Sequence, residues 1–259
     1  MSVFETFGVK HLSASALNKW QGCRGAWVAH YLFDIKGQVG PAAWRGTAVE
    51  AGLTAALVGT GNVDPLQQAM MAFENEAQGD ADDAVDKQRE LIPPFVEQAI
   101  AGWKEAGLDK PVTQQVRTEL WFDGLDVPII GYADFVMEGY TVDLKTTERL
   151  PSKPSYNHTL QAAGYASARG EDSACLFYVT PKKSALYRLT AEDIASANRD
   201  MRRTAIGLQA SLRAALYACD GDLSRAKATM AKMSPPNPDS FYWDDGSLAE
   251  ALAIVQAWT

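Results

Sequence analysis

The sequence GYADFVMEGYTVDLKTTER, residues 131 to 149, decides the fold class of this 259-residue chain. Two short runs rich in Val, Phe and Tyr flank Glu138-Gly139, a typical hairpin break, so we expect two antiparallel strands. Both strands carry charged residues at positions where a buried strand normally has apolar ones. These residues are Asp134 in the first strand, and Asp143 and Lys145 in the second.

Alternation along the second strand separates an apolar face from a polar face. Val142 and Leu144 share one face, because successive side chains point to opposite sides of a strand. Asp143 and Lys145 share the other face. The hairpin would bring Asp134 close to Asp143, and two carboxylates at that distance repel unless a cation lies between them. Ligands that are all oxygen atoms favour Mg²⁺ or Mn²⁺ over zinc. The alternative is an ion pair of Lys145 with one aspartate on the solvated face of the sheet.

The composition is that of an ordinary globular protein, with 47% hydrophobic and 22% charged residues. No run approaches the roughly 18 consecutive apolar residues that a membrane span needs, and the N-terminus lacks the pattern of a secretory signal. We therefore expect a cytoplasmic protein with no membrane partner. Three widely separated cysteines, Cys23, Cys175 and Cys219, suggest neither a disulfide framework nor a metal knuckle.

The net charge of −8 argues at first against a nucleic-acid partner, because Lys and Arg dominate phosphate binding. The acids, however, are concentrated in two segments. Residues 74–90 have a balance of −5, and residues 237–259 have a balance of −4, which leaves +1 for the rest of the chain. The bases gather in residues 181–188, 199–203 and 225–232, which are either solvated helix faces or phosphate-binding groups.

The first hundred residues are predicted to be mostly helical. Apolar residues recur at steps of three and four, Ser13 is a candidate cap, and breaks containing Gly or Pro separate the runs. Pro93-Pro94 is expected to interrupt the last run. The expected helices cover residues 13–32, 42–58, 65–77 and 87–107, with a loop at 59–64.

A change of composition after residue 110 predicts a sheet. Short runs rich in Val, Ile, Thr, Tyr and Trp are separated by hairpin-type breaks, and a helical segment lies between the third and fourth runs. This order indicates an α/β domain with a mixed sheet. The expected strands cover residues 112–124, 127–138, 140–149, 173–183 and 185–190, and the expected helices cover 155–170 and 191–219.

Three further motifs accompany the Asp-x-Lys strand. Glu50 lies in RGTAVE on a predicted helix. Gln161 and Tyr165 lie four positions apart in QAAGY, on one face of another predicted helix. The serine-rich segment LSASALNKWQGC precedes both helices. The joint order of these motifs is much more specific than any one of them.

Together the motifs resemble the PD-(D/E)XK nucleases of the RecB type, which include phage exonucleases and nucleases of CRISPR adaptation. That family has a serine-rich helix, an Arg-Gly-x-x-x-His helix, a Gly-x-x-Asp strand, a Val-x-Asp-x-Lys-Thr strand and a Gln-x-x-x-Tyr helix. The chain has matching segments in the same order over residues 12–165. The resemblance implies a restriction-endonuclease-like α/β core, in which a small mixed sheet is flanked by helices and preceded by a helical N-terminal region.

The resemblance also implies one nuclease domain over residues 1–259. A mainly helical part at 1–110 would carry Glu50. The catalytic sheet and the Gln-x-x-x-Tyr helix would occupy 111–190, and a helical part would follow at 191–259.

The resemblance assigns roles to individual residues of the site. Asp134 and Asp143 would bind one or two catalytic Mg²⁺ or Mn²⁺ ions, with the backbone carbonyl of Leu144 as a further ligand. Lys145 would be the catalytic lysine. Glu50 stands where RecB-type members usually have a metal-binding histidine, so the ligand set would consist of oxygen atoms alone.

Candidate DNA contacts come from the Gln-x-x-x-Tyr helix and from the basic clusters. Gln161 and Tyr165 match the family helix that supports the active site and contacts the DNA backbone, with routine packing of an alanine-rich helix as the alternative. His158, earlier on this helix, is expected to be structural or exposed rather than catalytic. The candidates for gripping phosphates are Lys182, Lys183, Arg202 and Arg203.

No iron-sulfur cluster is expected. Cys23 is followed by Arg24 where the family pattern has proline, so we expect a buried thiol rather than a ligand. The segment at 235–246 resembles the tail of phage members in which cysteines complete such a cluster, yet it contains no cysteine. A cluster normally takes four thiolates.

The predicted function is metal-dependent hydrolysis of DNA by an exonuclease that acts on linear DNA in phage-type recombination or repair. DNA is the expected partner, a single-strand annealing protein is a further candidate, and the location would be the cytoplasm of a bacterial host if the chain is phage-encoded. The alternatives are a non-catalytic DNA-end-binding protein on the same fold, a DNA endonuclease, and a helical protein that binds a partner through its acidic segment at 74–90.

Overall fold

Five strands form one sheet and follow each other in space in the order β1-β2-β3-β4-β5. β3 and β4 are parallel, whereas β2 pairs with β3, and β4 with β5, in antiparallel fashion. The mixed sheet predicted from the sequence is therefore confirmed, in a computed structural model that describes residues 2–59, 63–80 and 82–257. The strands are β1 Thr113–Leu120, β2 Ile129–Val136, β3 Thr141–Thr146, β4 Ala174–Val179 and β5 Ser184–Leu189.

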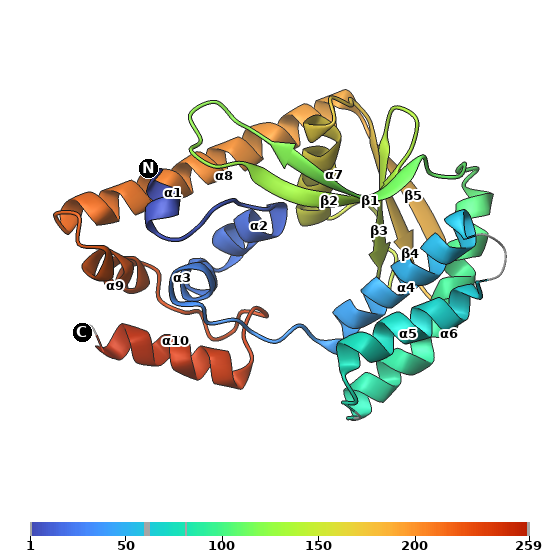
Figure 1. The fold of residues 1–259 in the computed structure, drawn as a ribbon, viewed down its shortest axis with the longest axis horizontal. Coiled ribbons are helices and arrows are strands. Elements are labelled where there is room, and N and C mark those ends of the chain that lie inside the picture. Colours follow the sequence, from blue (N-terminus) through green and yellow to red (C-terminus); the bar gives the residue numbers. More distant parts are fainter. Residues whose placement is uncertain (1, 60–62, 81, 258–259) are drawn as a thin grey trace. The chain divides into compact units, whose positions relative to one another are not determined.

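The chain forms two compact units (Figure 1). Unit 1 comprises Met1–Gln38, Glu119–Gly131 and Ala195–Thr259, and unit 2 comprises Val39–Thr118 and Tyr132–Ile194. The helices of unit 1 are α1 Val3–Thr6, α2 Ala14–Gly22, α3 Arg24–Phe33, α9 Leu223–Met233 and α10 Asp245–Ala257. The helices of unit 2 are α4 Pro41–Val58, α5 Pro65–Ala77, α6 Asp83–Glu105 and α7 Tyr156–Ala168, while α8 Ala191–Ala218 begins in unit 2 and continues in unit 1.

Helix α6 begins at Asp83, earlier than the predicted residue 87, and continues without a break through Pro93-Pro94. A proline inside a helix removes a hydrogen bond and clashes with a carbonyl, at a cost of about 3 kcal/mol. Ile92, Phe95 and Val96 flank the two prolines and are at most 3% exposed. Burial of each such side chain contributes about 1.5 to 3 kcal/mol. Burial of these three side chains is of the same order as the penalty of two prolines. The helix continues through them, so the predicted interruption is wrong.

The single helix predicted over residues 13–32 is also wrong, because the chain forms α2 and α3 with Cys23 between them. Cys23 has extended backbone angles and is buried, as predicted for this thiol. The break allows α3 to approach another part of unit 1 very closely. A Cβ added at Gly25 would lie 2.7 Å from the carbonyl oxygen of Pro235. The predicted loop at 59–64 falls partly on residues 60–62, which lie outside the described residues.

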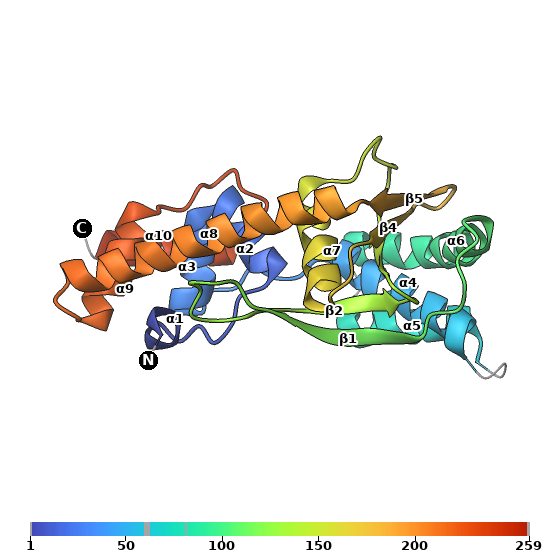
Figure 2. The same cartoon turned by 90° about the horizontal axis from the view of Figure 1, so that it is seen from above.

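The core of unit 2 lies between the sheet and helices α4, α5 and α6. Val142 and Leu144 face this core, as alternation along β3 predicted. Trp103 of α6 packs edge-on against Phe135 and Phe177, with ring centroids 5.0 and 5.7 Å away. Helix α7 covers the opposite side of the sheet (Figure 2). The polar face of β3 is therefore directed to the α7 side.

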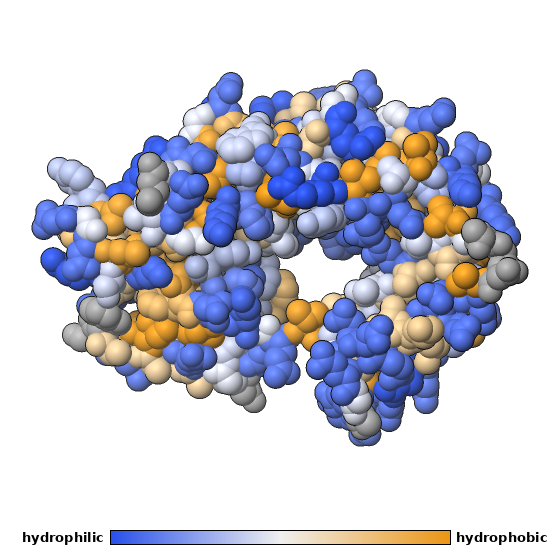
Figure 3. Space-filling view, in the orientation of Figure 1, coloured by the Kyte–Doolittle hydropathy of each residue, from blue (hydrophilic) through white to orange (hydrophobic). Residues whose placement is uncertain are grey.

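The acidic segment at 74–90 covers the end of α5 and the start of α6. Asp82 caps α6 by accepting a hydrogen bond from the N–H of Val85. Arg89 forms ion pairs with Glu74 and Asp86. Figure 3 shows a mostly hydrophilic surface over the connection between these two helices. The segment thus forms a solvated surface with its own internal ion pairs.

No helix in the described part of the chain is both long enough and apolar enough to cross a membrane.

Candidate active site

The β2–β3 hairpin brings Asp134 and Asp143 together. Its register pairs Phe135 with Val142, so the two aspartates lie one position beyond this pair. Oδ2 of Asp134 accepts a hydrogen bond of 2.8 Å from the backbone N–H of Leu144. This bond holds the Asp134 carboxylate against β3, next to the residue that follows Asp143.

Asp143 and Lys145 form a buried ion pair on the polar face of β3. Nζ of Lys145 lies 2.7 Å from Oδ2 of Asp143, and the two side chains are 17% and 1% exposed. The pair of the alternative interpretation therefore forms, but in a buried position rather than on a solvated face. Oδ1 of Asp143 is buried and has no hydrogen-bond partner among the described residues. A buried carboxylate oxygen without a partner is unfavourable, so this position suits an additional cation or donor.

Helix α4 supplies the third carboxylate, Glu50. Its Oε1 accepts a hydrogen bond from Nε2 of Gln115 on β1. Burial raises the pKa of Glu50, the Gln115 hydrogen bond lowers it, and the nearby Asp143 charge raises it further. Glu50 therefore lies within electrostatic range of the aspartates.

The charges of this cluster interact strongly. Burial raises the pKa of Asp134 well above its ordinary value, and repulsion by Asp143 and Glu50 adds to the effect. Burial also raises the pKa of Asp143, although Lys145 partly offsets this. Burial lowers the pKa of Lys145, but attraction by Asp143 and Asp134 outweighs it and leaves the pKa above its ordinary value. Lys145 is consequently a fixed positive charge at neutral pH.

Helix α7 places two of the predicted DNA contacts beside this cluster. Nε2 of Gln161 donates a hydrogen bond of 2.7 Å to the hydroxyl of Tyr165. Burial, followed by repulsion from Asp143, raises the pKa of Tyr165 to about 12. The phenol therefore remains protonated at neutral pH.

His158 lies on the same helix, nearer its N-terminus. Its Nδ1 is 2.7 Å from the hydroxyl of Tyr178, which is the β4 partner of Lys145 in the sheet register. Burial and the charge of Lys145 lower the pKa of His158 to about 4. The imidazole is therefore neutral at neutral pH, half-buried and in contact with Tyr178, which agrees with the expected structural role.

Comparison with protein families identifies the chain. A family model described as the PD-(D/E)XK nuclease superfamily matches residues 11–241. The chain belongs to this superfamily. Membership implies a nuclease that acts on DNA, and nucleases of this superfamily usually use divalent metal ions. The curated proteins provide no match.

Solved structures with a similar fold include a candidate exonuclease from Eubacterium rectale. It is 14% identical in sequence, the alignment covers 92% of this chain and 87% of that one, and the TM-score is 0.54. A second structure, that of the protein SSO0001, is 20% identical over 54% of this chain and 70% of that one, with a TM-score of 0.32. The first likeness agrees with the PD-(D/E)XK fold.

The carboxylate cluster has oxygen donors that suit a hard cation, but they are not arranged around a shared cation position. Within the described residues, no group of three or more His, Cys, Asp or Glu side chains is placed to hold a metal ion. Asp143 already forms an ion pair with Lys145. Glu50 already accepts a hydrogen bond from Gln115. The donors available are nevertheless all carboxylate oxygens, and Oδ1 of Asp143 is buried without a partner in the described chain. Oxygen donors of this kind fit Mg²⁺ or Mn²⁺.

The remaining predicted DNA contacts lie outside this cluster. Lys182 and Lys183 are exposed in the turn between β4 and β5, where the hydroxyl of Thr180 accepts hydrogen bonds from their backbone N–H groups. Arg202 and Arg203 lie on α8 within unit 1. They line a surface groove with two further arginines of the same helix, Arg199 and Arg213.

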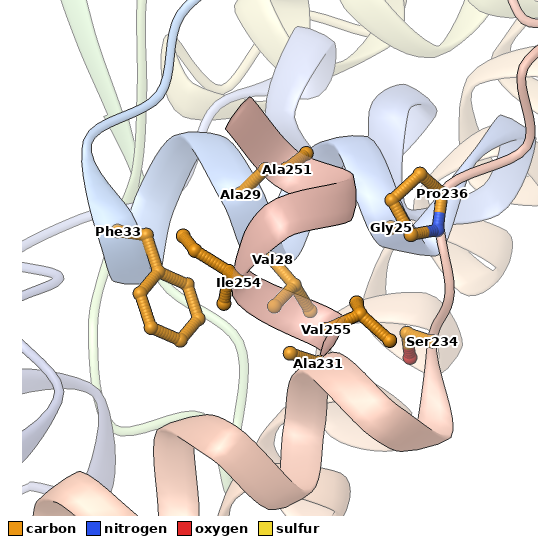
Figure 4. A pocket seen from close by; sticks show the side chains of 10 residues that line it. All are labelled: Gly25, Val28, Ala29, Phe33, Ala231, Ser234, Pro236, Ala251, Ile254 and Val255. Carbon is orange, nitrogen blue, oxygen red and sulfur yellow. The ribbon is translucent and has the colours of Figure 1, made fainter. Parts of the chain in front are cut away.

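An apolar pocket in unit 1 is unrelated to this chemistry (Figure 4). Its lining includes Val28, Phe33, Ile254 and Val255, and none of its lining residues is charged. A cavity of about 10 Å³ is at the lower limit for one water molecule. It is a small apolar gap rather than a candidate active site.

No sequence pattern predicts a role for two residues that lie near the carboxylates. Gln115 contacts Glu50, and Tyr178 contacts His158. Tyr178 lies in an apolar run, ACLFYV, in which nothing distinguishes it from core residues. Gln115 lies in VTQQVRTEL, where its position on a strand was predicted but its contact across to a helix was not.

Proposed function

We propose that the chain is a metal-dependent deoxyribonuclease, and specifically an exonuclease that hydrolyses phosphodiester bonds of linear DNA in phage-type recombination or repair. The observation that carries this proposal is the buried pair of Asp143 and Lys145 beside Asp134, in a chain of the PD-(D/E)XK superfamily. Paired carboxylates next to an amine suit this reaction, because they offer ligands for a cation and a positive charge for the phosphate. The choice of an exonuclease rests on the resemblance to phage exonucleases.

The proposed metal ligands are the side chains of Glu50, Asp134 and Asp143 with the backbone carbonyl of Leu144. They would hold Mg²⁺ or Mn²⁺. The chemistry that such an ion supplies is polarisation of a phosphoryl oxygen and a lowered pKa of bound water. Asp143 would contribute Oδ1, the oxygen that has no partner within the described chain.

Lys145 acts in the proposed mechanism as a permanent positive charge. The carboxylates around it raise its pKa, so the ammonium does not need to exchange a proton during the reaction. It would orient the attacking water and stabilise negative charge that develops on the phosphate in the transition state. Lys145 follows Asp143 by two positions on β3, so the strand holds both side chains next to each other on the same face.

The residues proposed to contact DNA are of two kinds. Neutral side chains lie beside the carboxylates, and basic side chains lie elsewhere. Gln161 and Tyr165 would donate hydrogen bonds to the DNA backbone, since the Tyr165 hydroxyl keeps its proton. The basic residues would grip phosphates without reading bases, because phosphate contacts position a duplex but carry no sequence information. These basic residues are Lys182, Lys183, Arg202 and Arg203.

The decisive experiment incubates the purified protein with end-labelled linear DNA, with and without Mg²⁺. Asp134→Ala, Asp143→Ala and Lys145→Ala should each abolish Mg²⁺-dependent digestion. Glu138→Ala is a matched control, because this exposed acid lies in the same hairpin without belonging to the carboxylate cluster. Equal digestion by the wild type and the three active-site variants would refute the assignment. Closed circular DNA distinguishes the two modes of cleavage, since an exonuclease leaves it intact and an endonuclease nicks it.

One observation favours a second candidate, a DNA-end-binding protein that does not hydrolyse DNA. Each of two carboxylates already has a partner from the chain itself, Asp143 with Lys145 and Glu50 with Gln115. Such a protein would bind linear DNA equally well in EDTA and in Mg²⁺ and would degrade neither strand. The same incubation therefore separates the two candidates.

A further inference from the structure

The backbone of β1 contains a residue in an unusual conformation, Gln115, whose φ is +48°. For a residue with a side chain this left-handed region costs about 1 to 2 kcal/mol. The other described non-glycine residues with positive φ are Asp34, Gln78 and Asp220, and they follow the ends of helices. A left-handed residue is a common way to end a helix. Gln115 lies inside a strand, so helix termination does not explain its conformation.

The side chain of Gln115 makes a contact that does explain it. Its Nε2 donates the hydrogen bond to Oε1 of Glu50, which is 65 residues away in the sequence. A left-handed residue within a strand is typical of a β-bulge, and bulges commonly redirect a side chain next to an active site. The neighbouring Gln114, in contrast, has a side-chain oxygen that is buried without a partner in the described chain.

Glu50 needs such a contact because of its surroundings. Its side chain is long and flexible, and the charges of Asp134 and Asp143 repel it. A carboxylate free to rotate would turn away from two like charges. An amide donor can hold the carboxylate without bringing a second ammonium into the cluster. The bond engages Oε1 and leaves Oε2 without this donor.

The geometry points to Gln115 as a positioning residue: the left-handed backbone of β1 aims its amide at Glu50 and keeps that carboxylate oriented for metal binding. The inference rests on the proposed function, in which Glu50 is a metal ligand. Strain in the strand is retained because it orients a ligand of the site.

Two substitutions remove the contact and relieve the backbone strain at the same time. Gln115→Gly removes both, since glycine adopts positive φ without penalty. Gln115→Asn keeps an amide and tolerates the left-handed backbone, but it is one methylene shorter and cannot reach Glu50. Gln114→Ala is the matched control, because it removes an adjacent amide that does not contact Glu50. Calorimetric titration of each full-length protein with Mn²⁺ gives the metal affinity, and thermal unfolding in EDTA gives the stability of the metal-free protein.

We expect both Gln115 variants to bind Mn²⁺ about tenfold more weakly than the wild type, the usual effect of removing a partner that orients a metal ligand. Their melting temperatures in EDTA should equal or exceed that of the wild type. Gln114→Ala should bind Mn²⁺ with wild-type affinity. In cleavage assays the Mg²⁺ concentration at half-maximal rate should rise, while kcat at saturating Mg²⁺ stays close to that of the wild type.

Other results would overturn the inference. Wild-type affinity in Gln115→Gly and Gln115→Asn, with weakened binding in Glu50→Gln, would refute the role of Gln115 and leave the proposed function standing. A melting temperature in EDTA that falls along with affinity would show that Gln115 is only a structural residue. If the wild type binds no Mn²⁺, or Glu50→Gln binds it normally, the proposed ligand set fails and the inference fails with it.

Discussion

Replacing Asp134 with asparagine should inactivate the protein and make its metal-free form more stable. Oδ2 of Asp134 accepts the N–H of Leu144 at 2.8 Å, and an asparagine oxygen can accept the same bond. The substitution therefore removes a charge and little else. That charge is unfavourable, because burial and repulsion by Asp143 and Glu50 raise the pKa of Asp134 well above its ordinary value.

The sign of the effect follows from proton linkage. At pH values between the ordinary pKa of about 3.9 and the pKa in the folded state, a carboxyl group with a raised pKa binds more protons in the folded than in the unfolded state. The wild type therefore loses stability as the pH rises through this range and remains destabilised above it. Asp134→Asn has no such loss, so its advantage should be present at pH 8 and should shrink as the pH falls toward about 4.

The magnitude can be estimated from the contacts of Asp134. Burying an ion costs several kcal/mol in proteins, and the Leu144 bond and the charge of Lys145 offset part of it. A gain of about 2 kcal/mol remains reasonable, and each kcal/mol raises the melting temperature of a chain of this size by about 2 to 4 °C. We therefore expect the melting temperature of Asp134→Asn in EDTA at pH 8 to exceed that of the wild type by about 4 to 8 °C.

Thermal unfolding in EDTA at pH 8 and pH 4, followed by the same scans with Mn²⁺, measures this effect. Mn²⁺ should stabilise the wild type more than Asp134→Asn, since only the wild type keeps all the proposed ligands. Asp239→Asn is the matched control, because this aspartate is exposed, and its stability should not change. A variant that is less stable than the wild type at pH 8, or a gain that is the same at both pH values, would refute the reasoning.

Three further substitutions test other parts of the structure. Gly102→Ala should lower the free energy of unfolding, measured by urea denaturation, by about 1 to 3 kcal/mol. The reason is that a Cβ at this position would lie 2.0 Å from Oγ of Ser184. Adding Ser184→Gly to the same chain should restore most of the lost stability. Tyr165→Phe keeps the ring but removes the hydroxyl that Gln161 contacts, so the rate of DNA hydrolysis should fall while stability changes by about 1 kcal/mol or less; unchanged kinetics would exclude a role for the hydroxyl. Arg202→Ala in an inactive background should weaken DNA binding. It should also reduce the slope of log K against log[salt] by about one, the value for one lost phosphate contact. An unchanged slope would place Arg202 outside the DNA interface.

The hairpin that carries Asp134 and Asp143 was predictable because local and tertiary requirements agree there. Gly139 has a φ of +80° in the turn, a conformation that glycine adopts freely. Val142 and Leu144 alternate with charged residues, and the apolar pair enters the core as this alternation requires. The turn glycine and the two apolar residues favour the same register, so the hairpin could be predicted from the sequence.

The helix boundaries that were predicted wrongly depend on packing between distant segments. Pro93-Pro94 signals an interruption locally, yet the neighbouring side chains are buried deeply enough to keep α6 intact. Cys23 lies in a run with continuous helical spacing, yet the chain breaks there and α3 packs closely against Pro235. Propensity and periodicity contain no information about such partners.

The contacts among the candidate residues were less predictable than the candidates themselves. The three carboxylates and the lysine could be named from motifs, but their partners could not. Alternation on β3 allows Lys145 to pair with either aspartate, and the structure selects Asp143. The positive φ of Gln115 has no sequence signal, because glutamine is not a residue that favours this conformation.

The charge balance of the cluster indicates why the fold keeps so unfavourable an arrangement. Three carboxylates and one ammonium would carry a charge of −2 if all were ionised, and Gln115 and the N–H of Leu144 supply hydrogen bonds but no charge. Protonation can relieve the excess, and the raised pKa values of Glu50 and Asp134 describe that tendency. A divalent cation relieves it in full, since its charge equals the deficit. A structural ion pair needs only one carboxylate for one lysine, so the two additional acids have no purpose in stability. Under the proposed function, these two acids would complete the ligand set of a divalent cation.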